Sequence, residues 1–415
     1  MIARTLIMFA TGFLILYAFR AVYLVTQKWS KLPRQLTRVL FLVTTFFVYI
    51  TTTYVSLNFD TYREVDWLMN YTIVGAITLS VTVLSICIIQ LISDIVLLFR
   101  YLRFRVQNKE IVSGGNAMTR RTFISKMALA TGGIMLGSFL WGMTKGKYGW
   151  RVIKNKLAFA NLPQSFDGVK IIQISDLHLG SFKENFGPLE EAVEMINALE
   201  PDYIFFTGDL VNESYTEAEA WIDVIKKLRA KRDKFAILGN HDYGWGTRSR
   251  DDKATNSLGV SRINREMGFK MLLNEHAILE HEGEKIGLVG VENWGWSEKG
   301  WFPMEGDYKK SVKDMEEVPF KILLSHDPTH WEHKILGQET DVDLTLAGHT
   351  HGGQMGITIP GLFELSVAKM FYKRYAGLYK EDKQHLYVNR GLGFLIFPGR
   401  VGMPPEITLH VLNKA

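Results

Sequence analysis

Apolar residues are concentrated in the first third of the chain, where they form four long stretches. About 20 mainly apolar residues are enough for a helix to cross the hydrocarbon core of a membrane. The first three stretches are rich in Leu, Ile, Val and Phe, whereas the fourth is shorter and contains several glycines. We therefore predict an all-α transmembrane region over residues 1–145, with helices at about residues 6–25, 39–57, 71–99 and 127–143.

The charges between these stretches predict an orientation, because Lys and Arg accumulate on the cytoplasmic side of a membrane. The first loop is basic, the second is acidic and the third is strongly basic. This order favours a multi-pass protein of the bacterial cytoplasmic (inner) membrane whose remaining residues lie on the periplasmic or outer side. The basic residues that directly follow the fourth stretch argue against this side, where such residues are normally sparse: Lys145, Lys147, Arg151, Lys154 and Lys156.

The third stretch contains the carboxylate Asp94 near its end. Ionisable residues inside membrane helices are costly and often functional. Asp94 is therefore either an interfacial carboxylate close to Arg100 or a proton-relay group.

The segment T-R-R-T-F-I-S-K at residues 119–126 precedes the fourth stretch. It is similar to a twin-arginine export signal, which moves folded and often cofactor-loaded domains. The alternative is a simple basic anchor. No small-x-small cleavage site directly follows, so we expect the helix to remain as an anchor.

From about residue 151 the pattern changes to short β-branched runs that alternate with polar helical stretches. We predict an α/β domain over residues 146–415, in which two sheets form a sandwich with helices outside, a four-layer αββα arrangement. The expected strands are 170–175, 203–207, 235–238, 286–291, 321–324, 344–346, 384–388 and 407–412, and the expected helices are 189–199, 217–231 and 257–267.

Composition excludes several classes of function. The 48 basic and 43 acidic residues are spread along the whole chain, so the sequence lacks the basic stripe of a nucleic-acid-binding protein. The single cysteine, Cys87, excludes an intramolecular disulfide framework and a thiolate metal cluster.

Polar residues gather at the points where the predicted strands end. In layered α/β folds the loops beyond the carboxyl ends of the strands form the ligand crevice, so we expect these residues to meet in space. They are all Asp, Asn and His, a set of N and O donors that suits Mn, Fe, Zn, Co or Mg. The motifs are Asp176-Leu177-His178, Gly208-Asp209, Gly239-Asn240-His241-Asp242, Ser325-His326-Asp327 and Gly348-His349-Thr350-His351.

The series D-x-H, G-D, G-N-H-D, a lone His and G-H-x-H, in this order, resembles the calcineurin-like metallophosphoesterase superfamily. The resemblance covers about residues 169–412, and five ordered motifs after strands form a highly specific signal. Weaker signatures are similar to the YkuE-like membrane-anchored or exported group: F-D-G at residues 166–168, N-R-G-L-G at 389–393 and P-P-E-I at 404–407.

The resemblance implies two divalent metal ions and a role for each motif residue. One metal would be held by Asp176, His178 and His351, and Asp209 would bridge to the second. A hydroxide between the metals would then attack phosphorus. His241 would contact the phosphoryl oxygen or protonate the leaving group, with Asp242 orienting it. The second metal would be held by Asn240, His326 and His349.

Histidines and arginines outside the motifs have structural interpretations as well as functional ones. His330 and His333 are either structural residues or part of the rim of the site. Arg390 and Arg400 either reach a substrate phosphate through a guanidinium fork or pair with structural carboxylates.

The resemblance implies a phosphate-ester substrate, and two features favour a lipid-linked one. Trp294, Trp296, Trp301 and Phe302 form either a small satellite core or an apolar flap that touches acyl chains and membrane lipids. The basic stretch 145–156 would hold the domain against anionic headgroups.

The leading hypothesis is a membrane-anchored phosphodiesterase or phosphatase acting on a lipid-linked phosphate or pyrophosphate. One alternative is UDP-diacylglucosamine pyrophosphohydrolase of lipid A synthesis, whose cytoplasmic substrate conflicts with the predicted orientation. The other is a non-catalytic membrane sensor, which the complete ligand set disfavours. The sequence leaves oligomeric state and metal identity open.

Overall fold

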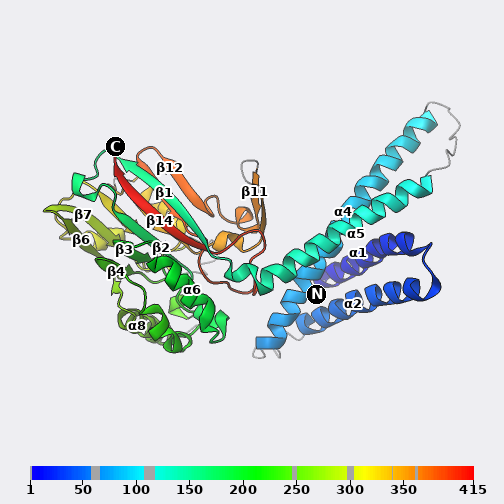
Figure 1. Ribbon diagram of the computed structural model, residues 1–415, viewed down its shortest axis with the longest axis horizontal. Helices are drawn as coiled ribbons and strands as arrows, with labels where there is room; N and C mark the ends of the chain where they lie inside the picture. The colour runs from blue at the N-terminus through cyan, green and yellow to red at the C-terminus, as the bar shows by residue number, and fades with distance from the viewer. Residues whose placement is uncertain are drawn as a thin grey trace. The chain divides into compact units, whose positions relative to one another are not determined.

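The computed structural model describes residues 2–57, 66–106, 117–244, 250–296, 303–338, 340–359 and 363–415. The chain divides into two compact units, Met1–Trp141 and Gly142–Ala415 (Figure 1). Each unit is described by itself.

The first unit is helical. Three described segments are long and apolar enough to span a membrane, Lys31–Val55, Thr72–Arg103 and Arg120–Thr144, and a shorter apolar segment covers Ala10–Thr26. The helices extend beyond the predicted apolar stretches because their polar ends continue the helical backbone, which a count of apolar residues does not detect. The helices are α1 (Ile2–Thr26), α2 (Lys31–Leu57), α4 (Asp66–Val106) and α5 (Ala117–Thr144).

A small apolar core joins these helices. Ile15 and Ala18 of α1 pack with Val83 and Ile86 of α4 and with Ala128 of α5. Helix α5 approaches α4 closely at Gly132, where a Cβ atom would lie 2.7 Å from the Ile86 side chain. Small residues that allow close backbone approach are typical of helix contacts in membranes.

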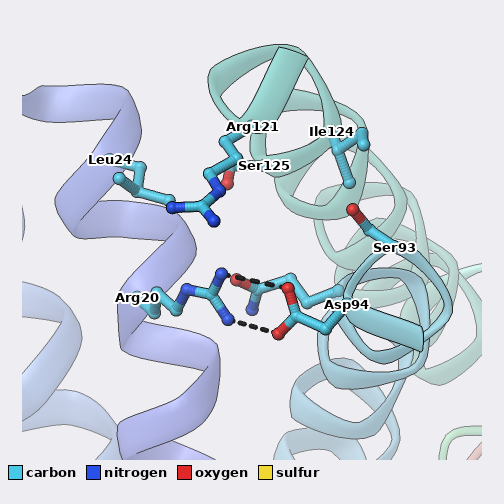
Figure 2. A pocket seen from close by; sticks show the side chains of 8 residues that line it. Arg20, Leu24, Ser93, Asp94, Arg121, Ile124 and Ser125 are labelled. Carbon is cyan, nitrogen blue, oxygen red and sulfur yellow. Dashed lines mark hydrogen bonds and ion pairs between the residues drawn. The ribbon is translucent and has the colours of Figure 1, made fainter. Parts of the chain in front are cut away.

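Asp94 of α4 forms an ion pair with Arg20 of α1. Arg20 reaches both oxygens of Asp94, with Nη2 3.1 Å from Oδ1. The Tyr17 hydroxyl also donates to Asp94 Oδ2 at 2.9 Å. Figure 2 shows this pair at a small pocket that Arg121 of the twin-arginine-like segment also lines. Neither interpretation of Asp94 from the sequence named this partner, because the pairing depends on how α1 packs on α4.

The second unit contains two six-stranded sheets among the described residues, with strand orders β1-β14-β2-β3-β4-β5 and β12-β13-β9-β8-β7-β6. A separate hairpin is formed by β10 and β11. The strands of the first sheet are β1 (Arg151–Phe159), β2 (Lys170–Ile174), β3 (Tyr203–Phe206), β4 (Asp233–Ala236), β5 (Lys270–Met271) and β14 (Glu406–Lys414). Those of the second sheet are β6 (Glu275–His281), β7 (Glu284–Gly290), β8 (Lys321–Leu324), β9 (Leu344–Ala347), β12 (Gly377–Glu381) and β13 (Gln384–Val388), and the hairpin consists of β10 (Gly356–Ile359) and β11 (Phe363–Ser366).

Apart from α6 and α8, the described helices of this unit are short. The α-helices are α6 (Phe186–Asn197), α7 (Ile222–Ile225), α8 (Arg250–Glu266), α9 (Tyr308–Ser311) and α10 (Pro328–His330). The π-helical turn η6 covers Trp331–Ile335, and the 3₁₀ turns are η1 (Gly146–Tyr148), η2 (Gln164–Phe166), η3 (Leu179–Phe182), η4 (Tyr215–Trp221), η5 (His241–Tyr243), η7 (His351–Gly353) and η8 (Val367–Met370).

Alternation along the strands creates the predicted four-layer sandwich. Phe205 of β3 points between the sheets and packs in one core with Ile322 of β8. Its neighbour Phe206 points to the opposite face, where helices α6 and α8 cover it. On the outer face of the second sheet, Leu323 packs with Trp331 of η6. Because side chains alternate between the two faces of a strand, buried strands have apolar residues at every position and serve two cores.

Some elements differ from the prediction. The expected helix at 217–231 is instead η4 and α7, with a capping box at Ser214 and Glu217 starting η4. The basic stretch expected to face lipid headgroups contributes to β1, an edge strand that pairs with β14. Trp294 is buried and bridges to Met304, whereas Trp296 is exposed. Trp301 and Phe302 lie outside the described residues.

Candidate metal centre

The predicted site residues follow strands that run in the same direction within each sheet. Strands β2, β3 and β4 are mutually parallel, and so are β8 and β9. Their carboxyl ends meet at one edge, which brings the five motifs together.

The turns at this edge are unusually tight. Five site residues other than glycine have a positive φ angle, which is uncommon and marks a constrained backbone. Main-chain bonds hold these turns, for example from the amide of His178 to the carbonyl of Asp209 at 3.2 Å. The five residues and their φ angles are Asp176 (50°), His178 (45°), Asp209 (59°), His349 (71°) and His351 (52°).

One group of donors consists of Asp176, His178 and His351, whose ligand atoms all lie within 4.8 Å of one another. Nε2 of His178 is 3.1 Å from Nε2 of His351, which is 3.4 Å from Asp176 Oδ1. The other ring nitrogen of His178 donates its proton to the Val211 carbonyl at 3.1 Å. Its Nε2 therefore presents a lone pair to the group.

A second group consists of Asp209, His326 and His349, again within 4.8 Å of one another. Nδ1 of His326 donates to the Thr207 carbonyl at 2.7 Å, and its Nε2 lies 3.1 Å from Asp209 Oδ2. Asn240 Oδ1 adjoins this group, 3.2 Å from His326 Nε2 and 2.7 Å from His349 Nδ1. The same Asp209 oxygen is 3.6 Å from His178 Nε2, so Asp209 lies between the two groups.

Among the protein groups alone, His326 is the main source of positive charge in this cluster. Burial raises the pKa of Asp176 to about 6; the charge of His326 opposes this shift, and the carboxylate of Asp209 adds to it. Burial lowers the pKa of His178 to about 3. For His326 the effect of burial is outweighed by Asp209, and its pKa rises to about 10.

This donor set fits divalent cations. Carboxylate oxygens and imidazole nitrogens face one another in a region almost closed to solvent, where lone pairs repel unless a cation or proton lies between them. The described donors are all N and O atoms, which suit Mn, Fe, Zn, Co or Mg.

His241 stands beside the donors, but Asp242 does not orient it as predicted. Nδ1 of His241 lies 2.7 Å from the main-chain carbonyl of Asn212, to which it donates. The Asp242 carboxylate instead accepts the amides of Asp209, Leu210 and Gly239 at 2.8–2.9 Å. Asp242 thus ties together the loops after β3 and β4. The prediction failed because adjacent side chains in the turn η5 point in different directions.

Three further residues contact the candidate ligands, and the sequence pattern predicted no role for them. Asn212 Oδ1 lies 3.1 Å from His178 Nδ1. Asp327 Oδ2 is 3.4 Å from His349 Nε2, and the Tyr372 hydroxyl is 2.8 Å from the same atom. Asp327 directly follows His326 and was open to detection, whereas Tyr372 lies outside every motif.

The structure favours the structural interpretation of the residues outside the motifs. Arg390 pairs with Glu364 at 3.1 Å. Arg400 is buried and donates to the His351 carbonyl at 2.9 Å, and burial lowers its pKa to about 9. His330 Nδ1 lies 2.9 Å from the Ser325 hydroxyl. The His333 ring stacks on Trp296 with a centroid distance of 5.1 Å.

Comparison with known proteins agrees with this geometry. The model of the calcineurin-like phosphoesterase family matches residues 169–353. The uncharacterized metallophosphoesterase YkuE of Bacillus subtilis is 31% identical over 312 residues, which cover 72% of this chain and 98% of that protein. The chain belongs to the calcineurin-like phosphoesterase family. This phosphoesterase is therefore a metal-dependent phosphoric ester hydrolase, and its substrate is a phosphate ester.

Further similarities concern the helical unit and possible substrates. The model described as a probable calcineurin-like phosphoesterase transmembrane domain matches residues 1–147, so this phosphoesterase is a membrane protein. A transmembrane protein with metallophosphoesterase domain from Danio rerio is 27% identical and covers 75% of this chain and 67% of its own. The UDP-2,3-diacylglucosamine pyrophosphatase LpxG of Chlamydia trachomatis is 30% identical and covers 60% of this chain and 86% of its own.

Proposed function

We propose that this membrane-anchored phosphoesterase hydrolyses a lipid-linked phosphate or pyrophosphate with two divalent metal ions. The observation that carries the proposal is the pair of donor groups on either side of Asp209, in a chain whose first 147 residues match a transmembrane family model. The UDP-2,3-diacylglucosamine pyrophosphatase among its relatives supports a lipid-linked ester.

The residues at the strand ends hold and position the reacting groups in this proposal. Two divalent ions bound there would polarise phosphoryl oxygens and lower the pKa of water at the site. Asp209 would hold both ions. The other proposed ligands are Asp176, His178 and His351 for one ion and Asn240, His326 and His349 for the second.

His241 is the proposed proton donor to the leaving oxygen. Its Nδ1 proton is engaged by the Asn212 carbonyl, which fixes the ring plane and assigns proton transfer to Nε2. Asp242 contributes indirectly. Its carboxylate accepts three hydrogen bonds from main-chain amides, and these hold the loops that carry Asp209 and Asn240.

The experiment that tests this function is an ester panel with the purified full chain in lipid nanodiscs and added Mn²⁺, Zn²⁺ or Mg²⁺. The panel contains phospholipids, lipid-carrier pyrophosphates and a soluble aryl phosphodiester. We expect turnover of a lipid ester that a chelator abolishes and Mn²⁺ restores. Hydrolysis of the aryl ester alone would contradict the lipid-linked substrate.

A second candidate substrate is UDP-2,3-diacylglucosamine, which the name of the Chlamydia relative suggests. Release of UMP from this compound in the same nanodisc assay would support it. The candidate is excluded if another lipid pyrophosphate is cleaved and this one is not.

We further propose that the second unit, Gly142–Ala415, lies on the outer side of the cytoplasmic membrane, as the basic, acidic, basic order of loop charges favours. We call this unit the catalytic unit. The test uses a Cys87→Ser chain with Lys414→Cys. An impermeant thiol reagent applied to intact cells after outer-membrane removal should label it. Labelling only after lysis would place the unit in the cytoplasm.

A further inference from the structure

Exposed apolar side chains of the catalytic unit gather around the hairpin β10–β11. The described part of residues 142–415 has ten large hydrophobic residues that are exposed, and seven of them lie between residues 357 and 396. Leu378 belongs to β12, and the other six are on the hairpin or on segments next to it. Contiguous apolar surface on a folded unit marks an interaction site. We call these six the apolar rim: Ile357, Leu365, Val367, Met370, Phe371 and Ile396.

Main-chain contacts hold the segments of the apolar rim together. Ile357 and Leu365 are directly opposite in the antiparallel hairpin, so their side chains share a face. Turn η8 follows β11 and places Met370 and Phe371 outward, with 79% and 74% of each side chain exposed. The Gln354 side chain donates to the carbonyls of Leu395 and Phe397, which fixes the loop on both sides of Ile396.

Ile396 has a strained backbone. Its φ is 61°, a conformation that β-branched residues rarely adopt, and its side chain is 69% exposed. Burial in the core does not explain this strain. Strained residues of this kind cluster at functional sites.

The apolar rim is continuous with the metal centre. Phe371 points outward, and its neighbour Tyr372 points inward to within 2.8 Å of Nε2 of the candidate ligand His349. The Ser366 hydroxyl at the end of β11 donates to the carbonyl of Gly352, next to His351. Tyr372 and Ser366 therefore connect the apolar rim directly to the segments that carry the candidate ligands.

Residues 142–144, which belong to the same unit as the apolar rim, contact the loop beside it. Gly142, near the end of α5, accepts the Arg400 amide at 3.1 Å, and the next residue, Val401, accepts the amide of Gly356 in β10 at 2.8 Å. The candidate span in α5 ends at Thr144. Within this unit, the start of β10 therefore lies close to Gly142.

Lysines complete the pattern of a surface that faces lipid. Exposed Lys369 and Lys373 flank Met370 and Phe371, and exposed Lys145 directly follows α5. Apolar side chains bordered by Lys are typical of segments that lie at the boundary of headgroups and acyl chains, where lysines meet anionic headgroups.

We propose that the apolar rim inserts into the headgroup region of the bilayer in which the chain is anchored, and that a lipid-linked ester passes along it to the metal centre. The substrate part of this proposal rests on the proposed function. The occupant is an anionic lipid bilayer.

Insertion is measured with a fluorescent thiol label on Met370→Cys in the full Cys87→Ser chain, reconstituted in nanodiscs of phosphatidylcholine and phosphatidylglycerol. Nitroxide-labelled lipid should quench the label severalfold more strongly than it quenches a matched label at Leu258→Cys. Leu258 is equally apolar and exposed but lies on α8, which packs on the first sheet. Aqueous iodide should show the opposite preference.

Substrate delivery is measured with the double variant Leu365→Ser, Met370→Ser. We expect its KM for a lipid-embedded ester to rise about tenfold, because two apolar side chains no longer bind lipid. Its kcat/KM for a soluble aryl diester should stay within about twofold of the unmodified chain, which also shows that the variant is folded.

The outcomes separate this proposal from the proposed function. Iodide quenching without lipid quenching at position 370 overturns insertion, whatever the enzyme hydrolyses. Shielding from both quenchers also overturns it, because another protein surface then covers the apolar rim. Lipid quenching without turnover of any lipid ester supports insertion and contradicts only the lipid-linked substrate.

Discussion

The metal centre and the helical unit both place charged groups out of water, but they compensate the charge in opposite ways. In the helical unit Asp94 meets Arg20, so a negative group has a positive partner within the chain. In the metal centre two carboxylates and several imidazoles face one another, and His326 is the principal source of positive charge. A paired charge is complete by itself, whereas a cluster of donors requires an ion from outside.

The two regions should also respond differently to substitution. Removing one partner of an ion pair leaves one uncompensated charge. Removing one donor from a shared cluster weakens the binding of the ion by all the remaining ligands. Effects at the metal centre should therefore be larger and should appear in metal content as well as in activity.

The largest effect is expected for Asp209→Asn. Asp209 lies between both donor groups, so its loss should reduce turnover by about 10³-fold or more. Bound metal per chain, measured by mass spectrometry, should fall in parallel. The matched control is Asp223→Asn on α7, an exposed carboxylate distant from the motifs. Full metal occupancy in Asp209→Asn would refute the bridging role.

The next effect is expected for His241→Ala. A proton donor contributes about 10²-fold or more to turnover. Unlike Asp209→Asn, this variant should keep its metal, because His241 is not among the candidate ligands. The loss should also be smaller for an ester whose leaving group is strongly acidic and needs no proton. Equal losses for good and poor leaving groups would argue against proton donation.

A third kind of buried ionisable group stays neutral, and it provides a reference for the comparison. Burial lowers the pKa of His410 to about 3, below the ordinary 6.5. The unfolded chain therefore takes up the proton first as the pH falls. The stability contributed by neutral His410 is complete above about pH 6.5 and is lost as the pH falls toward 3.

The variant His410→Gln tests this, since its amide can keep the contact with Gln173 at 3.1 Å. As the pH falls from 6 to 4, the unfolding free energy of the variant should fall less steeply than that of the unmodified chain. The two slopes should differ by about 1.4 kcal/mol per pH unit. Denaturant titrations at several pH values measure this slope. Parallel curves would show that His410 is protonated in the folded state.

The smallest effect is expected for the ion pair of the helical unit. Arg20→Gln and Asp94→Asn should each lower stability, and a double-mutant cycle should give a coupling of about 1 kcal/mol. About one third of each side chain is exposed within the protein itself, which limits the value. Thermal unfolding in nanodiscs measures it. Additive effects would mean that the pair contributes nothing.

The positions of eight strands and of the metal motifs were predictable, because they depend on local pattern. The ranges 321–324 and 384–388 match β8 and β13 residue for residue, since buried runs and their ends are visible in the sequence. Strand β1 was missed because its lysines interrupt the apolar pattern, as is common on an edge strand.

Contacts between distant segments were not predictable. Three contacts depend on how two elements pack. They are the hydrogen bonds from main-chain amides to Asp242, the hydrogen bond from His241 to the Asn212 carbonyl, and the pairing of Asp94 with Arg20. A motif indicates which side chains gather at an edge, but the direction of each side chain within a turn follows only from the assembled backbone.

The position of β14 has a consequence for the order in which the catalytic unit forms. Strand β14 lies between β1 and β2, although it is synthesised after every other strand (Figure 1). The ribosome will have produced all the membrane helices, and both sheets except this strand, before the first sheet can close. Until then β1 and β2 each expose an unpaired edge, so a nascent chain that stalls before residue 406 is a target for chaperones and proteases.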